Sequence, residues 1–306
     1  SKTLQPSRTH RITMRATLQA ITRQLAQQAH SKTEYQSHQP LYGGDINQSF
    51  LLNTTGNGRF FIKINQAQRL SMFEAEAAAL YEMEHSKSIR VPHPILSGSA
   101  DKSAFLVLEY IELKNANTAS EALLGHQLAA MHRTTQQQFG WHRDNTIGST
   151  PQLNALENHW HLFWQRHRIA PQLHWAAERG APKSLCQKGE KLLDQLPQRL
   201  EGHTPAAALL HGDLWGGNWS TTQQGEPLLY DPALYYGDRE TDLAMTELFG
   251  GFSQRFYAAY NESYPLQEGY AQRKKLYNLY HTLNHFNLFG GSYGRQAEQM
   301  IDHLLG

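Results

Sequence analysis

The spacing of apolar residues over the first 111 positions predicts several strands and two helices. Apolar residues recur at helical spacing over residues 13–29, which predicts an amphipathic helix. Apolar runs within 41–52, over 60–64 and over 104–111 predict buried strands, the first of them divided by a Gly-Gly turn. Between the second and third runs, residues 69–83 predict a further helix. The first third of the chain therefore combines strands with helices.

The rest of the chain has mostly helical patterns, with one conspicuous pair of short apolar runs. Residues 206–210 and 227–230 predict two buried strands, separated by glycines and polar residues. Helical periodicity covers four further segments. These expected helices are 119–132, 159–175, 268–289 and 293–305.

Three polar side chains are associated with the two apolar runs. Asp213 follows the first run, Asn218 comes five residues later, and Asp231 ends the second run. If the two strands form a hairpin, all three residues lie at one end of it. Each residue alone is more simply explained as a turn cap. Together, at this spacing, they favour the arrangement of eukaryotic-type kinases, in which they have defined roles.

The chemistry of phosphoryl transfer explains these residue types. Mg²⁺ on ATP requires hard oxygen ligands, which we assign to Asn218 and Asp231. A carboxylate aimed at the attacking hydroxyl accepts its proton, and this base is expected to be Asp213. The sequence therefore predicts an enzyme that uses ATP and Mg²⁺.

A lysine within an apolar strand supports the same interpretation. Burying Lys63 is costly unless its charge is paired, and kinases pair such a lysine with a helix glutamate while it holds the α and β phosphates. Glu74 and Glu76 both lie on the following helix but point about 200° apart, so only one can serve. We predict Glu76, which begins an alanine-rich run that packs into the core. The alternative is a lysine that extends from an edge strand into solvent.

Two backbone segments complete the expected nucleotide site. Gly43 and Gly44 form a turn from which no side chain projects, so their amides could cover phosphates. An ordinary hairpin explains that turn better, because the pattern lacks the full glycine motif. In the kinase layout, backbone groups from Glu109 to Ile111 would bind adenine.

Composition limits the other possibilities. The chain has 306 residues with 40% hydrophobic content and a net charge of +1, which gives no basic footprint for nucleic acid or membrane binding. Its single cysteine, Cys186, favours a reducing, cytoplasmic location. Residues 1–13 are polar and basic without an apolar core, so we expect an N-terminal extension and not a signal peptide.

Departures from protein kinases indicate a small-molecule substrate. The first triplet is His-Gly-Asp, Asp231 is followed by Pro232 and Ala233, and no activation segment follows. These features resemble aminoglycoside phosphotransferases and choline kinases.

More specific motifs resemble the fructosamine kinase (ketosamine 3-kinase) family. They are the runs His211-Gly212-Asp213-Leu214-Trp215-Gly216-Gly217-Asn218, Asp231-Pro232-Ala233 and Tyr236-Gly237-Asp238-Arg239-Glu240-Thr241-Asp242-Leu243-Ala244-Met245. The resemblance implies an α+β, two-lobed protein-kinase-like fold. An ATP-binding lobe with an antiparallel sheet would span residues 14–112, and a mainly helical catalytic lobe would span 113–306.

The resemblance also implies the reaction and further site residues. ATP would phosphorylate the 3-hydroxyl of a ketosamine, free or on a glycated protein, and so promote release of the sugar from the amine. Trp215 is the expected sugar contact, and Asp238, Arg239 and Glu240 are expected to contact substrate hydroxyls or the amine. Asp242 is expected to brace the catalytic loop.

Two alternatives remain open. The chain could be a kinase of another small hydroxyl compound, such as an aminoglycoside or choline. It could also be a non-catalytic nucleotide-binding protein, which is disfavoured because every catalytic position is filled.

Overall fold

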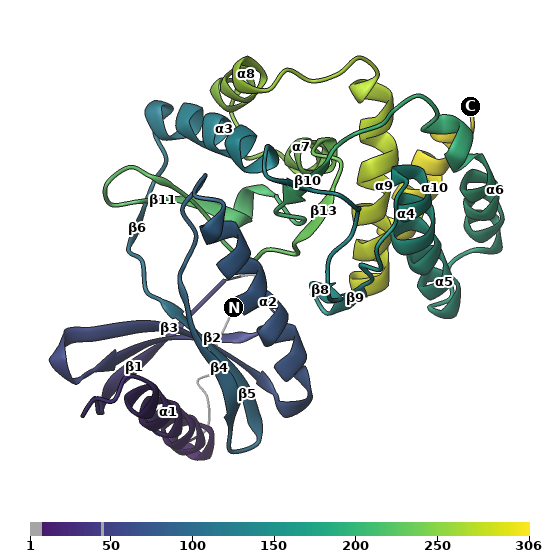
Figure 1. Ribbon diagram of the computed structural model, residues 1–306. Coiled ribbons are helices and arrows are strands. Elements are labelled where there is room, and N and C mark those ends of the chain that lie inside the picture. The colour runs from purple at the N-terminus through teal and green to yellow at the C-terminus, as the bar shows by residue number, and fades with distance from the viewer. Residues whose placement is uncertain (1–7, 44–45) are drawn as a thin grey trace. The chain divides into compact units, whose positions relative to one another are not determined.

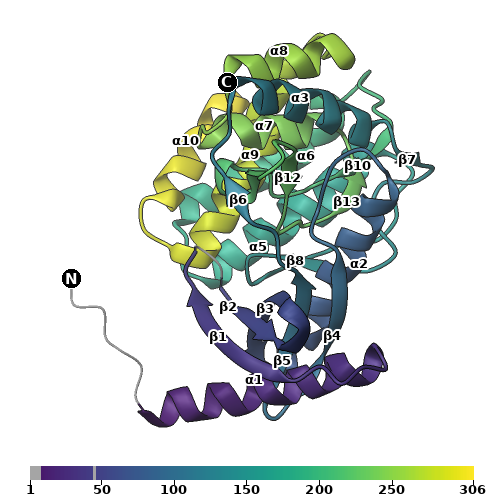
Figure 2. The same cartoon turned by 90° about the vertical axis from the view of Figure 1, so that its left-hand side faces the viewer.

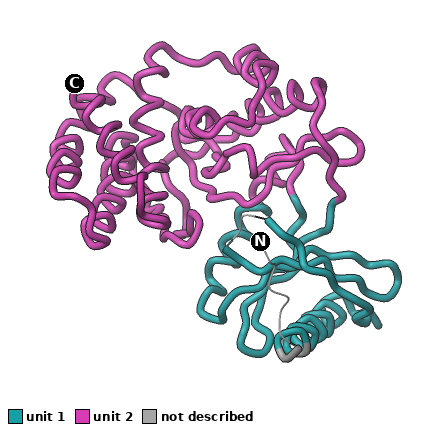
Figure 3. Tube along the Cα trace, turned by 180° about the vertical axis from the view of Figure 1, so that it is seen from behind, with its two compact units in different colours: residues 1–81, 92–111 teal, residues 82–91, 112–306 magenta. Residues whose placement is uncertain are grey.

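The computed structural model describes residues 8–43 and 46–306 and divides into two compact units. Their described parts are coloured separately in Figure 3: the first unit comprises residues 8–81 without 44–45, together with 92–111, and the second comprises 82–91 and 112–306. The chain enters the second unit finally after Ile111. Residues 82–91, which lie within the range expected for the ATP-binding lobe, belong to the second unit.

The first unit is built on a five-stranded antiparallel sheet (Figure 1). The spatial order is β1-β2-β3-β5-β4. Its strands are β1 (Tyr35–Leu41), β2 (Gln48–Thr54), β3 (Gly58–Gln66), β4 (Pro94–Ala100) and β5 (Ser103–Glu109). We did not predict β4, because its proline, glycine and serines conceal the strand pattern.

Helices cover the sheet on both faces. In Figure 2, α1 (Arg8–Gln28) lies along one face, where its Leu18 and Ile21 pack with Ile62 and Ile64 of β3. Side chains alternate along a strand, so Lys63 points to the opposite face, toward α2 (Leu70–His85). Helix α1 already begins within residues 1–13, where we expected an extension, and residues 1–7 lie outside the described residues.

The second unit is mainly helical. Helix α9 packs against α5, α7 and α10 (Figure 1). The helices are α3 (Thr118–His132), α4 (Trp160–Trp164), α5 (Ala170–Glu178), α6 (Lys183–Arg199), α7 (Glu240–Leu248), α8 (Gln254–Ser263), α9 (Tyr270–Phe289) and α10 (Tyr293–Leu305). A π-helical turn over Gln165–Ile169 joins α4 to α5, so the helix predicted over 159–175 changes its winding in the middle.

Short strands form three small sheets in this unit. In the first, β10 lies between β13 and β7, and in the second, β11 lies between β12 and β6. The third is the pair β8–β9. The strands are β6 (Leu113–Lys114), β7 (Thr135–Gln136), β8 (Asn145–Ile147), β9 (Thr150–Gln152), β10 (Ala207–Leu210), β11 (Trp219–Thr222), β12 (Pro227–Leu229) and β13 (Tyr235–Gly237).

The predicted hairpin between the two apolar runs is wrong. The first run, β10, pairs with β13 and β7, whereas the second, β12, pairs with β11. The sequence of β11, Trp-Ser-Thr-Thr, has little apolar content, and it therefore lacks the apolar signature of a buried strand. Asn218 and Asp231 nevertheless meet at one end of a hairpin, because Asn218 immediately precedes β11.

Candidate active site

The turn that carries Asp213 leaves β10 through a left-handed glycine. Gly212 has a φ of +89°, where a residue with a Cβ is strained. A Cβ at this position would lie 1.9 Å from the carbonyl oxygen of Ala233. The amide of Ala233 donates to the carbonyl oxygen of His211 at 2.8 Å. The loop that bears Asp213 is thereby tied to the segment that follows Asp231.

Both ring nitrogens of His211 hold the same turn. Its Nδ1 accepts a hydrogen bond from the amide of Asp213 at 3.1 Å. The ring proton is therefore assigned to Nε2, which donates to the carbonyl oxygen of Tyr230 at 2.7 Å. Burial lowers the pKa of His211, although the charge of Asp242 opposes this shift. The neutral imidazole links the two halves of the site without adding charge.

Asp242 braces this loop through hydrogen bonds to its backbone, which confirms the role expected for it. Its Oδ2 accepts from the amide of His211 at 2.9 Å, and its Oδ1 accepts from the amide of Gly212 at 2.9 Å. The Nε2 of His132 lies 2.8 Å from Oδ2. Burial alone would raise the pKa of Asp242, but the hydrogen bond and charge of His132 bring it below the usual value.

Asn218 and Asp231 lie at the end of the β11–β12 hairpin. The amide of Tyr230 donates to the carbonyl oxygen of Asn218 at 3.1 Å. The side-chain Nδ2 of Asn218 donates to the backbone oxygen of Asp213 at 2.9 Å and lies 3.4 Å from its Oδ2. Asp231 has a φ of +53°, a strained conformation for an aspartate that is often found at functional sites.

This donor set fits a hard divalent cation. Because Nδ2 of Asn218 points toward Asp213, the side-chain amide oxygen of Asn218 points away from Asp213. Together with the carboxylate of Asp231, it offers the oxygen ligands that such ions prefer. The structure thus brings Asp213, Asn218 and Asp231 together within the second unit.

Trp215 stands two residues after Asp213, and its side chain lies at the surface, with 39% of the residue exposed. The ring lies over Gly217, where a Cβ would be only 2.1–2.5 Å from three ring carbons. A Cβ added at Gly216 would lie 3.2 Å from backbone atoms of both Gly250 and Gly251. Neither glycine has a positive φ, so the backbone conformation itself does not require them. They are required because other groups lie against them.

In the first unit, Lys63 pairs with Glu76 as predicted. Its Nζ lies 2.6 Å from Oε1 of Glu76, and the two side chains are 4% and 13% exposed. Glu74 is exposed on the other side of α2. Lys63 is therefore a buried lysine whose charge is paired, as the strand pattern indicated.

The other predicted nucleotide contacts also belong to the first unit. Gly43 follows β1, whereas Gly44 lies outside the described residues. The amide of Glu109 already donates to the carbonyl oxygen of His93 at 2.9 Å, and its Oε1 accepts from the amide of His93 at 2.8 Å. Ile111 is the last residue before the chain enters the second unit.

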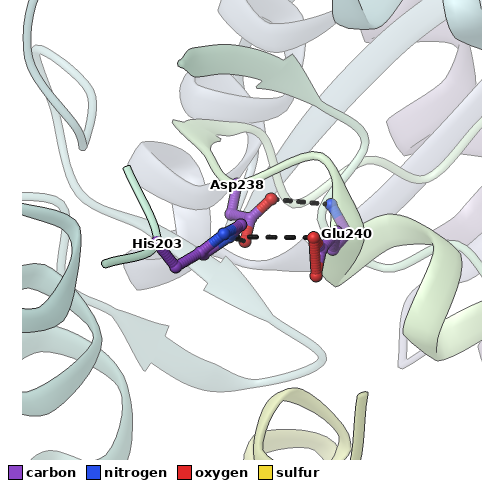
Figure 4. Close-up of side chains that lie close together, drawn as sticks. All are labelled: His203, Asp238 and Glu240. Atoms are coloured by element: carbon purple, nitrogen blue, oxygen red, sulfur yellow. Dashed lines mark hydrogen bonds and ion pairs between the residues drawn. The ribbon is translucent and has the colours of Figure 1, made fainter. Parts of the chain in front are cut away.

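Asp238 and Glu240, predicted to contact substrate, instead face His203 within a buried cluster (Figure 4). Each carboxylate residue is 1% exposed. Asp238 Oδ2 lies 2.7 Å from Nε2 of His203 and accepts from the hydroxyl of Tyr277 at 2.6 Å. Arg273 donates to both oxygens of Glu240, at 2.7 and 2.9 Å.

Asp238 also lies two residues before the first residue of α7. Its Oδ1 accepts from the amide of Glu240 at 3.0 Å, and the hydroxyl of Thr241 donates to the carbonyl oxygen of Asp238 at 2.8 Å. Arg239 is 8% exposed and donates to the carbonyl oxygens of Tyr264 and Pro265 at 2.7 and 2.6 Å. We therefore interpret the side chains of the Asp238–Glu240 run as fixing the start of α7, the helix that carries Asp242, whereas their contact with substrate stays a prediction.

One arginine of the second unit is buried among aromatic rings, which the sequence analysis did not predict. Arg168, in the π-helical turn, is fully buried and lies over the rings of Tyr235 and Phe163 at 4.0 and 4.7 Å. It donates to Asn154 Oδ1 at 2.7 Å. No sequence signal marks it, because an arginine among aromatic residues on a helix usually points to solvent.

Polar residues of β8 and β9 reach the segment just after Asp231. Gln152 donates to the carbonyl oxygen of Ala233 at 3.0 Å, and Asn145 donates to that of Leu234 at 2.8 Å. Tyr280 of α9 donates to Oε1 of Gln152 at 2.8 Å. These bonds couple the site to α9.

Within residues 8–43 and 46–306, no helix has both the length and the apolar content needed to cross a bilayer.

Comparison with known proteins identifies the family. The model of the fructosamine kinase family matches residues 17–306, which is nearly the whole chain. The protein belongs to the fructosamine kinase family. As a member, it is an ATP-dependent kinase that phosphorylates a hydroxyl group, and its fold is kinase-like and α+β.

Individual relatives of this fructosamine kinase family member agree. A probable ketoamine kinase of Synechocystis sp. is 45% identical over 94% of this chain and 96% of its own. A chloroplastic protein-ribulosamine 3-kinase of Arabidopsis thaliana is 39% identical, over 86% of this chain and 81% of its own. The crystal structure of a putative fructosamine-3-kinase from Haemophilus somnus has a TM-score of 0.89 at 30% identity, covering 96% of this chain and all of that one. Neither an aminoglycoside or choline kinase nor a non-catalytic protein is favoured.

Proposed function

We propose that this protein phosphorylates the 3-hydroxyl of ketosamines, with ribulosamines preferred over fructosamines. The observation that carries the proposal is the grouping of Asp213, Asn218 and Asp231 around one hairpin end, with the exposed ring of Trp215 beside them. The ribulosamine preference is supported by the name of the Arabidopsis relative, a protein-ribulosamine 3-kinase.

Each residue has a distinct role in this proposal. Asp213 accepts the proton of the C3 hydroxyl as its oxygen attacks the γ-phosphorus of ATP and the bond to the β-phosphate oxygen breaks. Asn218 and Asp231 hold Mg²⁺, which neutralises charge on the phosphates. ADP leaves, and Asp213 afterwards releases its proton to solvent.

The first unit would supply the nucleotide contacts. Lys63, held by Glu76, binds the α and β phosphates. Backbone amides at Gly43 and Gly44 cover the phosphates, and backbone groups between Glu109 and Ile111 contact adenine. Since the amide of Glu109 is bonded to His93, we assign the donor in that segment to a later residue.

The substrate contact is assigned to Trp215. A flat indole suits the C–H face of a short sugar chain. Phosphate at C3 lies β to the C2 carbonyl, which makes elimination easy and frees the amine. The activity would therefore repair glycated amines, free or on proteins, and the single cysteine supports a cytoplasmic location.

The test is product identification by NMR after incubation with MgATP and a ribulosamine. We expect phosphate on C3, and we expect Asp231→Ala to abolish turnover while the circular dichroism spectrum is retained. Phosphate on another carbon would refute the proposed specificity. So would failure to phosphorylate ribulosamine and fructosamine while kanamycin or choline is readily phosphorylated.

A further inference from the structure

Four aromatic side chains form a continuous patch on the second unit. The rings of Phe249 and His285 are stacked, with centroids 5.0 Å apart and planes at 25°. His285 also contacts Phe289 at 5.8 Å and Tyr293 at 5.2 Å, and the last two rings are 6.2 Å apart. We call Phe249, His285, Phe289 and Tyr293 the aromatic patch.

The aromatic patch is open to solvent. Phe289 is 69% exposed and Phe249 is 46% exposed. Large apolar rings that contact one another at the surface are characteristic of binding sites, whereas single exposed apolar residues are commonplace. The patch therefore has a surface available to a ligand.

The backbone that follows Phe249 lies against the catalytic loop. Phe249 begins the segment 249–252, whose Gly251 lies against Gly216. The indole Nε1 of Trp219 lies 3.4 Å from the carbonyl oxygen of Gly251. The segment that begins with Phe249 therefore contacts the loop that carries Trp215.

Helix α9 provides a second connection. The hydroxyl of Tyr280 donates to Gln152 at 2.8 Å, and Gln152 donates to the carbonyl oxygen of Ala233, two residues after Asp231, at 3.0 Å. His285 and Phe289 follow on the same helix, five and nine residues later. At 1.5 Å per residue, Phe289 lies about 13 Å along the axis from Tyr280.

We propose that the aromatic patch binds the amine-bearing arm of the ketosamine, a protonated secondary amine that continues into the alkyl chain of a glycated lysine. This proposal rests on the proposed function and specifies its substrate further. The lysine adduct is then the favoured substrate, in preference to adducts of short amines.

The dimensions and chemistry of the lysine arm match the aromatic patch. From the C3 oxygen to the amine nitrogen is four bonds, and the lysine α-carbon is five bonds further. At about 1.2 Å per bond in an extended chain, this gives about 11 Å, comparable to the distance along α9. Aromatic faces attract ammonium groups and also cover methylenes.

The protonation state of the patch histidine is compatible with a cationic arm. Burial lowers the pKa of His285, so the ring is neutral at physiological pH. A neutral imidazole stacked on Phe249 presents aromatic surface without repelling an ammonium group.

The experiment compares two substrates that share the sugar and differ in the amine. They are Nα-acetyl-Nε-ribulosyl-lysine and the ribulosyl adduct of methylamine. The variants are Phe289→Ala, Phe249→Ala and the double variant, and Leu156→Ala is the matched control, since Leu156 is 48% exposed on the same unit but outside the aromatic patch. Thermal unfolding checks that each variant is folded.

We expect selective losses for the lysine adduct. In kcat/KM, each single variant should lose about threefold and the double variant about tenfold, mainly through KM. The methylamine adduct should change by less than about 1.5-fold, and Leu156→Ala should leave both substrates unchanged. The proposal would be overturned if the double variant kept the wild-type ratio of kcat/KM between the two substrates, whether both values fell equally or neither fell. If the wild-type protein phosphorylates neither ribulosamine, the proposed function itself fails.

Discussion

Replacing Gly217 by alanine should displace the indole of Trp215 without removing it. The added Cβ would lie 2.1, 2.4 and 2.5 Å from ring carbons Cη2, Cζ2 and Cζ3. Carbon atoms in ordinary contact are about 3.5–4.0 Å apart, so the ring must move by more than about 1 Å. Because Gly217 does not have a positive φ, alanine is tolerated by the backbone itself.

The size of the effect follows from the position of the ring. Trp215 is partly exposed, so its movement should cost little stability, about 1 kcal/mol or less. If the ring stacks on the sugar, losing that surface should cost about 1–2 kcal/mol of transition-state binding, or roughly a tenfold loss in kcat/KM. The affinity for MgATP should be unchanged.

A double-mutant cycle provides the control. Trp215→Ala should lower kcat/KM for a ribulosamine to the same extent, and Gly217→Ala should have no further effect in that background, because the clashing ring is gone. Steady-state kinetics of the four proteins gives the coupling free energy. Normal kcat/KM in the Gly217→Ala protein, or additive losses in the double variant, would refute the reasoning.

Three further predictions concern charged groups. Glu76→Ala should weaken MgATP binding and lower kcat/KM at least about tenfold, because Lys63 loses its partner, whereas Glu74→Ala should stay within about twofold in the same assay. Burial lowers the pKa of His281 from 6.5 to about 3, so its contribution to stability is complete above pH 6.5 and falls as pH decreases toward 3. In urea unfolding, the unfolding free energy of the wild-type protein should be about 2 kcal/mol lower at pH 5 than above pH 6.5, and this decrease should be smaller in His281→Asn. The same dependence of the unfolding free energy on pH in both proteins would contradict this prediction. Glu240→Gln should lower the unfolding free energy by about 2–3 kcal/mol while KM for ketosamine stays nearly unchanged. An unchanged unfolding free energy with a raised KM would instead indicate that Glu240 contacts the substrate.

Local sequence determined those parts of the site that depend on periodicity. Strand alternation turns Lys63 away from the face occupied by Ile62 and Ile64, and the helical repeat separates Glu74 from Glu76 by more than half a turn. Both relations follow from the backbone geometry of one element. The pairing of Lys63 with Glu76 was therefore predictable before the structure was known.

Partnerships between distant segments were decided only by the tertiary structure. The apolar run before Asp213 pairs with β13 and β7 and not with the run before Asp231, because apolar content marks a strand as buried without specifying its neighbour. The acidic run that starts α7 looked like a set of substrate ligands. Its carboxylates are instead paired with His203 and Arg273, which lie 35 and 33 residues away in sequence.

The catalytic loop illustrates both contributions. The identities of Asp213, Asn218 and Asp231, and their spacing, were sufficient to predict the chemistry, since phosphoryl transfer accepts few other side chains in those roles. The need for Gly217 was apparent only when the ring of Trp215 was found against it. Sequence encodes the chemistry and the buried face of each element, whereas steric contacts between side chains exist only once the chain has folded.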